Sequence, residues 1–526
     1  MNQETASSGV HFNLLDEPWI EVIDLEGVVT EVSIKDAVLR SHELADVISD
    51  HPTERVAMIR MLLAFLHRAY MGPVDEDVWR SLWGRGSFDD AVIEAYADRW
   101  HERFWLFHDE VPFGQMPSSC AVKWDDWASV DLSREPFFER SGPSSDSRTP
   151  AEAARWVIWR QAIDPAGIRS AIVDDPDAKG GKIYGNSVGW LGQLHHVLIR
   201  GESLFETLML NMIPWDRLRA GFGGLGDLPS WEKDPIVPMR ARPSVGIPTG
   251  PVDAFTWNSR RLSLKLDGDG LVREVSCAGG PYLVVWEGQG VNFETHSLWR
   301  RSEAQSKKQG RDVYSAPMVR VDQQFWRGLS DLLPVHDTTA GTMAVEWWAR
   351  LDLIGVLPAR VVIERSGMTY GTNSAVLDRE VGDSLMIPSG LLDEDRIDLR
   401  SLVEEGLHAL DETVRAIGSL GFVLGKAQNL NEGSLNAYID RAKTGLWADL
   451  DPVFRGWLVD FSMEETLPGM LAVASALART RGTMLMESLG PEAWCTSGPM
   501  KAWLKFESRL DKIVEALGSD EQEQSA

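Results

Sequence analysis

The amino-acid sequence predicts an α+β protein, in which a large mixed α/β domain over residues 1–390 is followed by a C-terminal four-helix bundle over residues 391–526. The chain has 526 residues, which at about 150 residues per domain suggests three domains, or two of which one is large. Strand-like and helical patterns are mixed up to about residue 390, and a helical apolar period follows. These three observations favour two domains of unequal size.

Local patterns define the first elements of the N-terminal domain. Trp19–Asp24 and Val28–Val32 flank Glu26-Gly27, which is typical of a β-hairpin. From Thr53 onward, apolar residues recur every three or four positions and predict a helix that faces the core. A second helix begins after Thr149, because Thr149-Pro150-Ala151-Glu152 supplies an N-cap hydroxyl, a first-turn proline and the glutamate of a capping box.

Segments rich in glycine and small polar residues bracket this second helix. Arg134–Ser147 cannot bury apolar area, and Asp164–Trp190 holds five glycines, so we expect both to be flexible and placed for binding. Further along, Leu262–Leu266 and Tyr282–Trp286 are strand-like. Arg300–Asp312 carries five cations against two acids. A solvated face is its simplest interpretation, and phosphate contact is the alternative.

Four amphipathic segments form the predicted bundle. Steps of three and four residues between apolar positions over Val403–Ile417 and Trp503–Leu517 are typical of helices. Leu435–Phe461 and Met463–Leu489 have a similar pattern, and we expect the first of them to break near Pro452. Short connectors make an antiparallel bundle the simplest arrangement.

Composition narrows the function. With 52 Lys and Arg against 79 Asp and Glu, the net charge of −27 excludes a wholly basic surface for nucleic acid, so any such contact is local. The three cysteines, Cys120, Cys277 and Cys495, are far apart, which excludes a C-x-x-C metal site and favours a cytoplasmic protein. No apolar stretch approaches the roughly 20 residues of a membrane span, so we expect no membrane contact. The 22 tryptophans are expected to fill the core.

Motifs linked to catalysis occur without the context that each requires. Gly221–Gly226 fits G-x-G-x-x-G, but no strand precedes it and no helix follows. Gly185–Gly189 fits G-x-S-x-G around Ser187, yet the residues before it are polar and glycine-rich. The histidines at positions 101, 108, 195 and 196 lack the spacing that places two metal ligands on one helix face. The patterns favour a binding subunit with no catalytic residue, metal or cofactor. A serine hydrolase using Ser187 and a protein-only scaffold stay open as alternatives.

Short motifs then follow one another in a specific order. Phe12–Ile20 comes first and Pro112–Gln115 second. The later ones are Thr149–Trp156, Asp164–Ser170, Lys179–Lys182, Gly189-Trp190, Trp299–Ser302 and Tyr370–Ser374. This ordered set resembles the CasA family, the large subunits of the type I-E CRISPR surveillance complex called Cascade. The resemblance runs from residue 11 to about residue 488.

The resemblance implies a fold and a function. The family combines a large mixed α/β domain with a C-terminal four-helix bundle and has no catalytic role of its own. It recognises the protospacer-adjacent motif on duplex DNA, starts strand opening and recruits a nuclease-helicase, while the guide RNA reads the sequence. The implied partners are the Cascade subunits CasB, CasC, CasD and CasE, the CRISPR RNA, double-stranded target DNA and the CRISPR-associated nuclease-helicase.

The resemblance also implies site residues. The RNA 5′ handle would be bound by the segment from Phe138 to Ser147, through Phe138, Arg140, Ser141 and Gly142. A glycine loop would approach the DNA motif, either at Asp164–Ser170 or, as the alternative, offset toward Gly180-Gly181. In both places the lack of a β-carbon allows close contact. Asn373 would stand at a position where other members have glutamine, which gives the strand-separating wedge a shorter amide. The implied DNA-binding residues are Pro165, Ala166, Gly167, Arg169, Gly180, Gly181, Lys182, Thr372, Asn373 and Ser374. The family's motif-contacting lysine has no counterpart in Gly280–Phe293.

Overall fold

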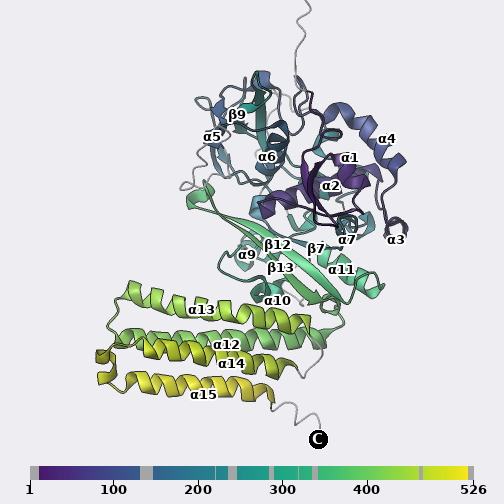
Figure 1. Cartoon of the computed structure of the whole chain (residues 1–526). Helices are drawn as coiled ribbons and strands as arrows, with labels where there is room; N and C mark the ends of the chain where they lie inside the picture. Colours follow the sequence, from purple (N-terminus) through teal and green to yellow (C-terminus); the bar gives the residue numbers. More distant parts are fainter. Residues whose placement is uncertain are drawn as a thin grey trace, which may run out of the picture. The chain divides into compact units, whose positions relative to one another are not determined.

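The protein divides into two compact units, drawn in Figure 1. The first comprises Met1–Asp322, Pro334–Trp348 and Val362–Ser384, and the second comprises Gln323–Leu333, Ala349–Val361 and Leu385–Ala526. The computed structural model describes residues 11–130, 146–219, 221–234, 246–283, 290–317, 319–333, 342–460 and 466–518. The predicted functional division at residue 390 stays a prediction.

A small antiparallel sheet opens the first unit. Its strands are β1 (Ile20–Asp24), β2 (Val29–Val32) and β3 (Leu44–Val47), in the order β2-β1-β3, with α1 (Ile34–Leu39) between β2 and β3. The Asp24 carboxylate closes the first turn by accepting hydrogen bonds from the backbone N–H groups of Glu26 and Val28, each at 2.9 Å. The predicted N-terminal hairpin is therefore confirmed.

Two helices form the centre of this unit. Helix α2 (Pro52–Ala69) is buried along most of its length and packs against α6 (Pro150–Ile163). Both hydrogen bonds of the predicted capping box between Thr149 and Glu152 are present, which confirms the start of α6. Further helices are α3 (Glu76–Trp83), α4 (Asp90–Trp100), α5 (Trp127–Val130), α7 (Leu204–Asn211) and α8 (Pro251–Phe255).

The tryptophans are mostly core residues, as predicted. Trp79, Trp127, Trp156 and Trp159 are all buried in the first unit. Trp79 stacks on Trp83 with ring centroids 5.4 Å apart. These indoles therefore act mainly as core packing.

A five-stranded sheet corrects one expectation. Its strands are β4 (Asp125–Asp126), β9 (Val272–Gly279), β5 (Gly167–Ser170), β6 (Lys182–Asn186) and β8 (Arg260–Leu266), where β8 pairs with β9. The segment Asp164–Trp190, expected to be flexible, supplies β5 and β6, because its backbone pairs with itself and with β9. The predicted strand at Leu262–Leu266 is confirmed. In Tyr282–Trp286 the described residues, Tyr282 and Leu283, belong to no strand, and the rest lies outside the described residues.

A third sheet carries the longest hairpin. Its order is β13 (Leu377–Pro388), β12 (Arg360–Tyr370) and β7 (His195–Arg200), with β12 and β7 antiparallel from Val362 opposite Arg200 to Gly367 opposite His195. Strand β7 is almost wholly buried, and its His196 ring stacks on that of His296 with centroids 5.7 Å apart. Strands β12 and β13 form the long arm in Figure 1.

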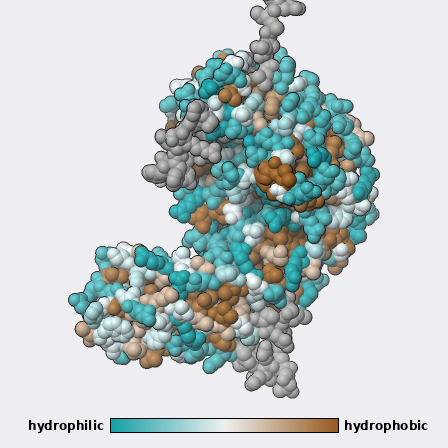
Figure 2. Space-filling view, in the orientation of Figure 1, coloured by the Kyte–Doolittle hydropathy of each residue, from teal (hydrophilic) through white to brown (hydrophobic). Residues whose placement is uncertain are grey.

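The basic stretch after residue 300 is a small exposed substructure. Strands β10 (Arg300–Arg301) and β11 (Tyr314–Ser315) pair antiparallel around the short helix α9 (Glu303–Gln309). Lys307, Lys308 and Arg311 are exposed. This exposure is compatible with a solvated face and with phosphate contact, so both interpretations stay open. Figure 2 shows a visible surface that is mostly hydrophilic, with separate apolar patches.

The second unit contains the predicted bundle. Its helices α12 (Ile397–Ala427), α13 (Glu432–Val459), α14 (Thr466–Glu487) and α15 (Gly498–Gly518) pack side by side in Figure 1. The predicted break near Pro452 is wrong, since α13 continues through it. Buried Leu450 and Phe454 anchor the helix on both sides of Pro452, and this packing offsets the lost backbone hydrogen bond. The short helix α10 (Leu329–Leu332) belongs to this unit, and the chain passes from one unit to the other within α11 (Met343–Leu353).

Within the described part of the chain, no helix has both the length and the apolar character needed to cross a membrane.

Candidate nucleic-acid interface

A buried aspartate lies at the end of α6, where the chain turns into β5. Asp164 is fully buried and contacts three guanidinium groups: Arg160 Nε at 2.5 Å, Arg169 Nη2 at 2.7 Å and Arg260 Nε. Burial alone would raise the pKa of Asp164, but the three positive charges lower it to about 2. Asp164 is therefore an anion that fixes the start of β5.

The residues after Asp164, Pro165–Ser170, are here called the glycine segment. Gly167 has a φ of +141°, a backbone conformation that L-residues other than glycine rarely adopt. Its carbonyl accepts a hydrogen bond from the Asn186 side chain at 3.0 Å, and the Pro165 carbonyl accepts one from Arg260 at 3.0 Å. Beyond them, 54% of the Ile168 surface is exposed. Pro165 is buried, and Ala166 and Gly167 are half-buried.

The second predicted element is the turn between β12 and β13. Gly371–Val376, here called the hairpin tip, is closed by a hydrogen bond from Gly371 N–H to the Val376 carbonyl at 2.9 Å. Asn373 and Ser374 have φ values of +55° and +54°. Asparagine adopts this left-handed conformation more readily than glutamine, which gives Asn373 a backbone role besides its amide. Thr372 and Asn373 are exposed.

The structure brings the glycine segment and the hairpin tip together. The backbone N–H of Ala166 donates to the Ser374 carbonyl at 2.8 Å, across 208 positions of sequence. Next to this bond, the Tyr370 hydroxyl donates to the Ile163 carbonyl at 2.7 Å. Pro165, Ala166 and Gly167 are therefore neighbours of the predicted wedge.

The other predicted glycines lie elsewhere on the same sheet. Gly180 and Gly181 are in the turn between β5 and β6, here called the far turn (Lys179–Lys182). Lys182 is opposite Ser170 in the strand register, so the far turn lies at the opposite end of β5 from Gly167, about 10 Å along the strand. Gly180 and Gly181, the alternative candidates for the predicted DNA contact, are thus separated from the hairpin tip.

Arg169 has partners within the protein. Its guanidinium binds Asp164 and donates to the Pro165 carbonyl at 2.6 Å, and its side chain is about one-fifth exposed. Its predicted DNA contact stays a prediction. The predicted RNA-handle residues Phe138, Arg140, Ser141 and Gly142 lie outside the described residues.

A cleft of about 980 Å³ lies between the glycine segment and strand β13. Residues that the sequence patterns did not single out line it, among them His51, Lys123, Arg379 and Glu380. The Arg379 guanidinium is exposed and has no ion-pair partner among the described residues, so it is available to an anionic ligand. No sequence pattern indicated these residues, because they come from distant segments of ordinary composition.

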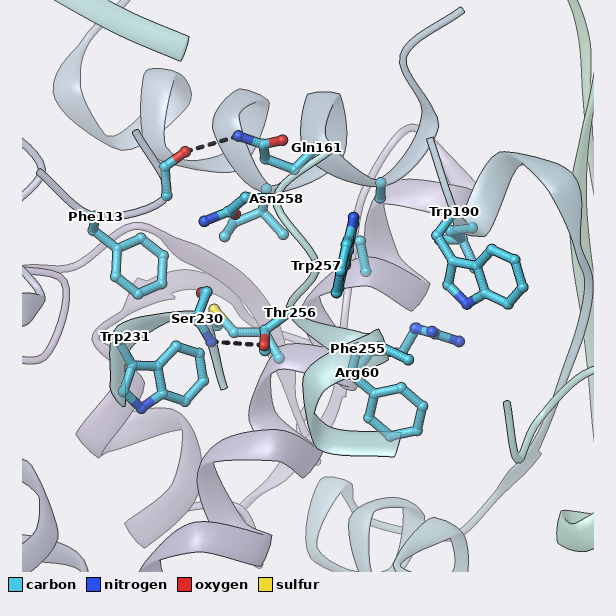
Figure 3. A pocket seen from close by; sticks show the side chains of 17 residues that line it. Arg60, Phe113, Gln161, Trp190, Ser230, Trp231, Phe255, Thr256, Trp257 and Asn258 are labelled. Atoms are coloured by element: carbon cyan, nitrogen blue, oxygen red, sulfur yellow. Dashed lines mark hydrogen bonds between the residues drawn. The ribbon is translucent and has the colours of Figure 1, made fainter. Parts of the chain in front are cut away.

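A smaller cavity lies between α2, α6 and α8. Its volume is about 40 Å³, and Figure 3 shows the rings of Phe113, Trp190, Trp231, Phe255 and Trp257 around it. The Gln161 amide and the Ser230 N–H bind acceptors within its wall, at 2.8 Å and 3.0 Å. This space holds a few water molecules at most and is too small for a nucleotide.

The catalytic motifs lack the required geometry in the described residues. No hydrogen bond joins the Ser187 hydroxyl to a histidine there, and a short 3₁₀ turn at Leu191–Gln193 follows Ser187 instead of the helix of a nucleophile elbow. Gly221–Gly226 likewise opens no helix. No group of three or more His, Cys, Asp or Glu side chains in the described part of the chain is arranged to hold a metal ion.

These features define a class of two-unit α+β proteins in which a glycine segment and a hairpin tip meet beside a cleft, and a helical bundle follows. The chain belongs to the CRISPR-associated Cse1 family, whose model matches residues 13–486. This membership confirms the resemblance found in the sequence.

Individual members of the family are similar to this chain in sequence and in fold. The CRISPR-associated protein CasA/Cse1 of Thermus thermophilus is 30% identical over 340 residues, which are 61% of this chain and 60% of that protein. The structure of Thermobifida fusca Cse1 is 30% identical with a TM-score of 0.85, over 96% of this chain and 98% of that one. Cse1 from Acidimicrobium ferrooxidans is 26% identical with a TM-score of 0.85, over 98% and 99%.

Proposed function

We propose that this chain is the non-catalytic large subunit of a type I-E Cascade complex. In this role it recognises the protospacer-adjacent motif on duplex DNA, promotes strand opening for guide-RNA pairing and recruits the nuclease-helicase. Its partners are the CRISPR RNA, target DNA and the subunits CasB, CasC, CasD and CasE. Family membership supports the setting, and the geometry around Ala166 supports the DNA contact.

The observation that carries the proposal is the hydrogen bond between Ala166 and Ser374. It places the Gly167 backbone, whose lack of a β-carbon allows close approach of a base edge or phosphate, beside the exposed Asn373 amide. One DNA site can therefore be read by the glycine segment and opened by the hairpin tip. Opening costs a few kcal/mol per unstacked step, so the tip needs rigid support.

The net charge of −27 fits this division of work. An acidic subunit binds bulk DNA weakly by itself, because affinity for phosphates grows with the number of cations that displace counterions. The contacts at Gly167 and Asn373 become effective once RNA and partner subunits hold the DNA in place. Sequence identity is then read by base pairing.

The test replaces Thr372, Asn373 and Ser374 together by alanine in a reconstituted complex. Strand opening, followed by 2-aminopurine fluorescence next to the motif, is expected to slow by about 10-fold or more, since the lost contacts oppose unstacking. Assembly with CRISPR RNA is expected to be unchanged.

The matched control is the double variant Leu25→Ala/Glu26→Ala, which alters another exposed hairpin turn of the same unit. Opening by the triple variant at the wild-type rate would remove the wedge assignment. Failure of the co-expressed chain to co-purify with short RNA would favour a protein-only scaffold.

A further inference from the structure

The N-terminus of helix α2 is capped by a residue from a distant strand. Pro52 occupies the first helical position, and the N-cap residue His51 makes no side-chain capping bond. Instead, one carboxylate oxygen of Glu380 on β13 accepts hydrogen bonds from the Thr53 backbone N–H at 2.7 Å and the Thr53 hydroxyl at 2.5 Å. Proline has no N–H, so Thr53 carries the first free amide of the helix, and the helix dipole favours a carboxylate there.

His51 and Trp159 complete the arrangement around Glu380. The second carboxylate oxygen lies 2.9 Å from His51 Nδ1. The His51 ring stacks on Trp159 of α6 with centroids 4.3 Å apart, and Trp159 Nε1 donates to the Thr53 hydroxyl at 2.9 Å. Residues from β13, α2 and α6 therefore meet at one half-buried carboxylate.

Two further contacts join the hairpin to the same turn of α2. A β-carbon at Gly382 would lie 2.5 Å from Pro52 Cγ, so the β13 backbone packs directly on the proline ring. On the other strand, Glu364 of β12 accepts a hydrogen bond from Arg55 Nη1 at 2.6 Å. Both strands of the hairpin are thus fixed to the first turn of α2.

We propose that Glu380 is a positioning residue for strand opening, a role that rests on the proposed function. The hairpin tip ends at Val376, four residues before Glu380, which is about 13 Å along an extended strand. Ser374 holds the tip to the glycine segment, and Glu380 holds strand β13 to α2 near the tip. The two attachments fix the position of Asn373 relative to Gly167. The tip therefore keeps its place while it separates the bases, and the hairpin does not move away from the DNA.

The experiment compares Glu380→Ala with Asp378→Ala in the reconstituted complex. Asp378 lies two residues away on the same strand, and among the described residues its side chain bonds only to Thr369 of the hairpin. This control therefore removes the same charge without touching α2. Glu380→Ala is expected to slow opening of a fully paired target by about 10-fold, equivalent to about 1.4 kcal/mol. Binding to a target already unpaired next to the motif is expected to stay within about twofold of wild type, since no opening is needed there.

Two further variants protect the test from a folding defect. Glu380→Gln keeps an oxygen for the Thr53 N–H and is expected to retain opening within about threefold. Gly382→Ala keeps the carboxylate but pushes β13 away from Pro52, and is expected to slow opening of the paired target as Glu380→Ala does.

The outcomes separate the two proposals. If Glu380→Ala opens the paired target at the wild-type rate, or impairs paired and unpaired targets equally, the positioning role is wrong. The alanine triple at the hairpin tip is measured in parallel. If that triple has no effect, the proposed function fails. If the triple slows opening while Glu380→Ala does not, only the role of Glu380 fails.

Discussion

The two ends of the β5–β6 hairpin have similar composition and different support. Gly167 at one end and Gly180-Gly181 at the other all have positive φ. The sequence resemblance left both ends as candidates for the DNA contact. Only the end at Gly167 rests on the buried Asp164 cluster and is bonded to the hairpin tip. The far turn is exposed and closed by its own backbone bonds. Glycine permits close approach, but the buried charges beneath it fix where that approach occurs.

The largest expected effect comes from removing Asp164, the carboxylate that Arg160, Arg169 and Arg260 share. Asp164→Ala leaves Arg160 and Arg260 buried without their anion, which costs about 3–5 kcal/mol when a buried pair is broken. We expect the free energy of unfolding of the first unit, measured in urea, to fall by about that amount.

The matched control is Asp177→Ala, an exposed carboxylate just before the far turn. It has no guanidinium partner among the described residues, so its effect is expected to stay within about 0.5 kcal/mol. Equal losses for the two variants would show that the two ends of the hairpin are supported alike.

The pH dependence sharpens the same comparison. Burial lowers the pKa of His67 and of His195 from 6.5 to about 4. As the pH falls from 6.5 to about 4, these histidines are protonated in the unfolded state but not in the folded state. The free energy of unfolding of the wild type therefore decreases over this range. The pKa of Asp164 is lowered to about 2 from 3.8, so its contribution is complete above 3.8 and is lost only as the pH falls from there toward 2.

The difference in unfolding free energy between wild type and Asp164→Ala is therefore expected to stay constant from pH 6.5 to about 4, while both proteins lose stability. Urea titrations across this range measure it. A difference that shrinks well above pH 3.8 would mean that the arginines do not hold Asp164 ionised.

How far the sequence predicted these features depends on how local each one is. The capping box at Thr149 was predictable because all its atoms lie within four residues. The helical period predicted the bundle. It did not show that packing on both sides of Pro452 keeps α13 continuous through the proline. The family resemblance implied roles for the glycine segment and the hairpin tip, but it did not predict the contact that joins Ala166 to Ser374. Likewise, nothing near Asp164 indicates Arg260, and nothing near Thr53 indicates Glu380, because such partners are brought together only by tertiary packing.

The smallest expected effect separates the two ends by backbone conformation alone. Gly167→Ala places a β-carbon on a residue with a φ of +141°, which costs about 1–3 kcal/mol of backbone strain. The new β-carbon causes no steric clash, because the nearest side-chain atom lies 3.7 Å away. Relief of that strain shifts the glycine segment against the hairpin tip, so affinity of the complex for motif-bearing DNA is expected to fall about 10-fold. Gly180 has a φ of +60° and open space around it, so the strain of Gly180→Ala is relieved in the exposed far turn. Affinity is then expected to change by less than about twofold. Equal losses in a filter-binding titration at fixed salt would place the DNA contact at both ends and remove the distinction that the Asp164 cluster supports.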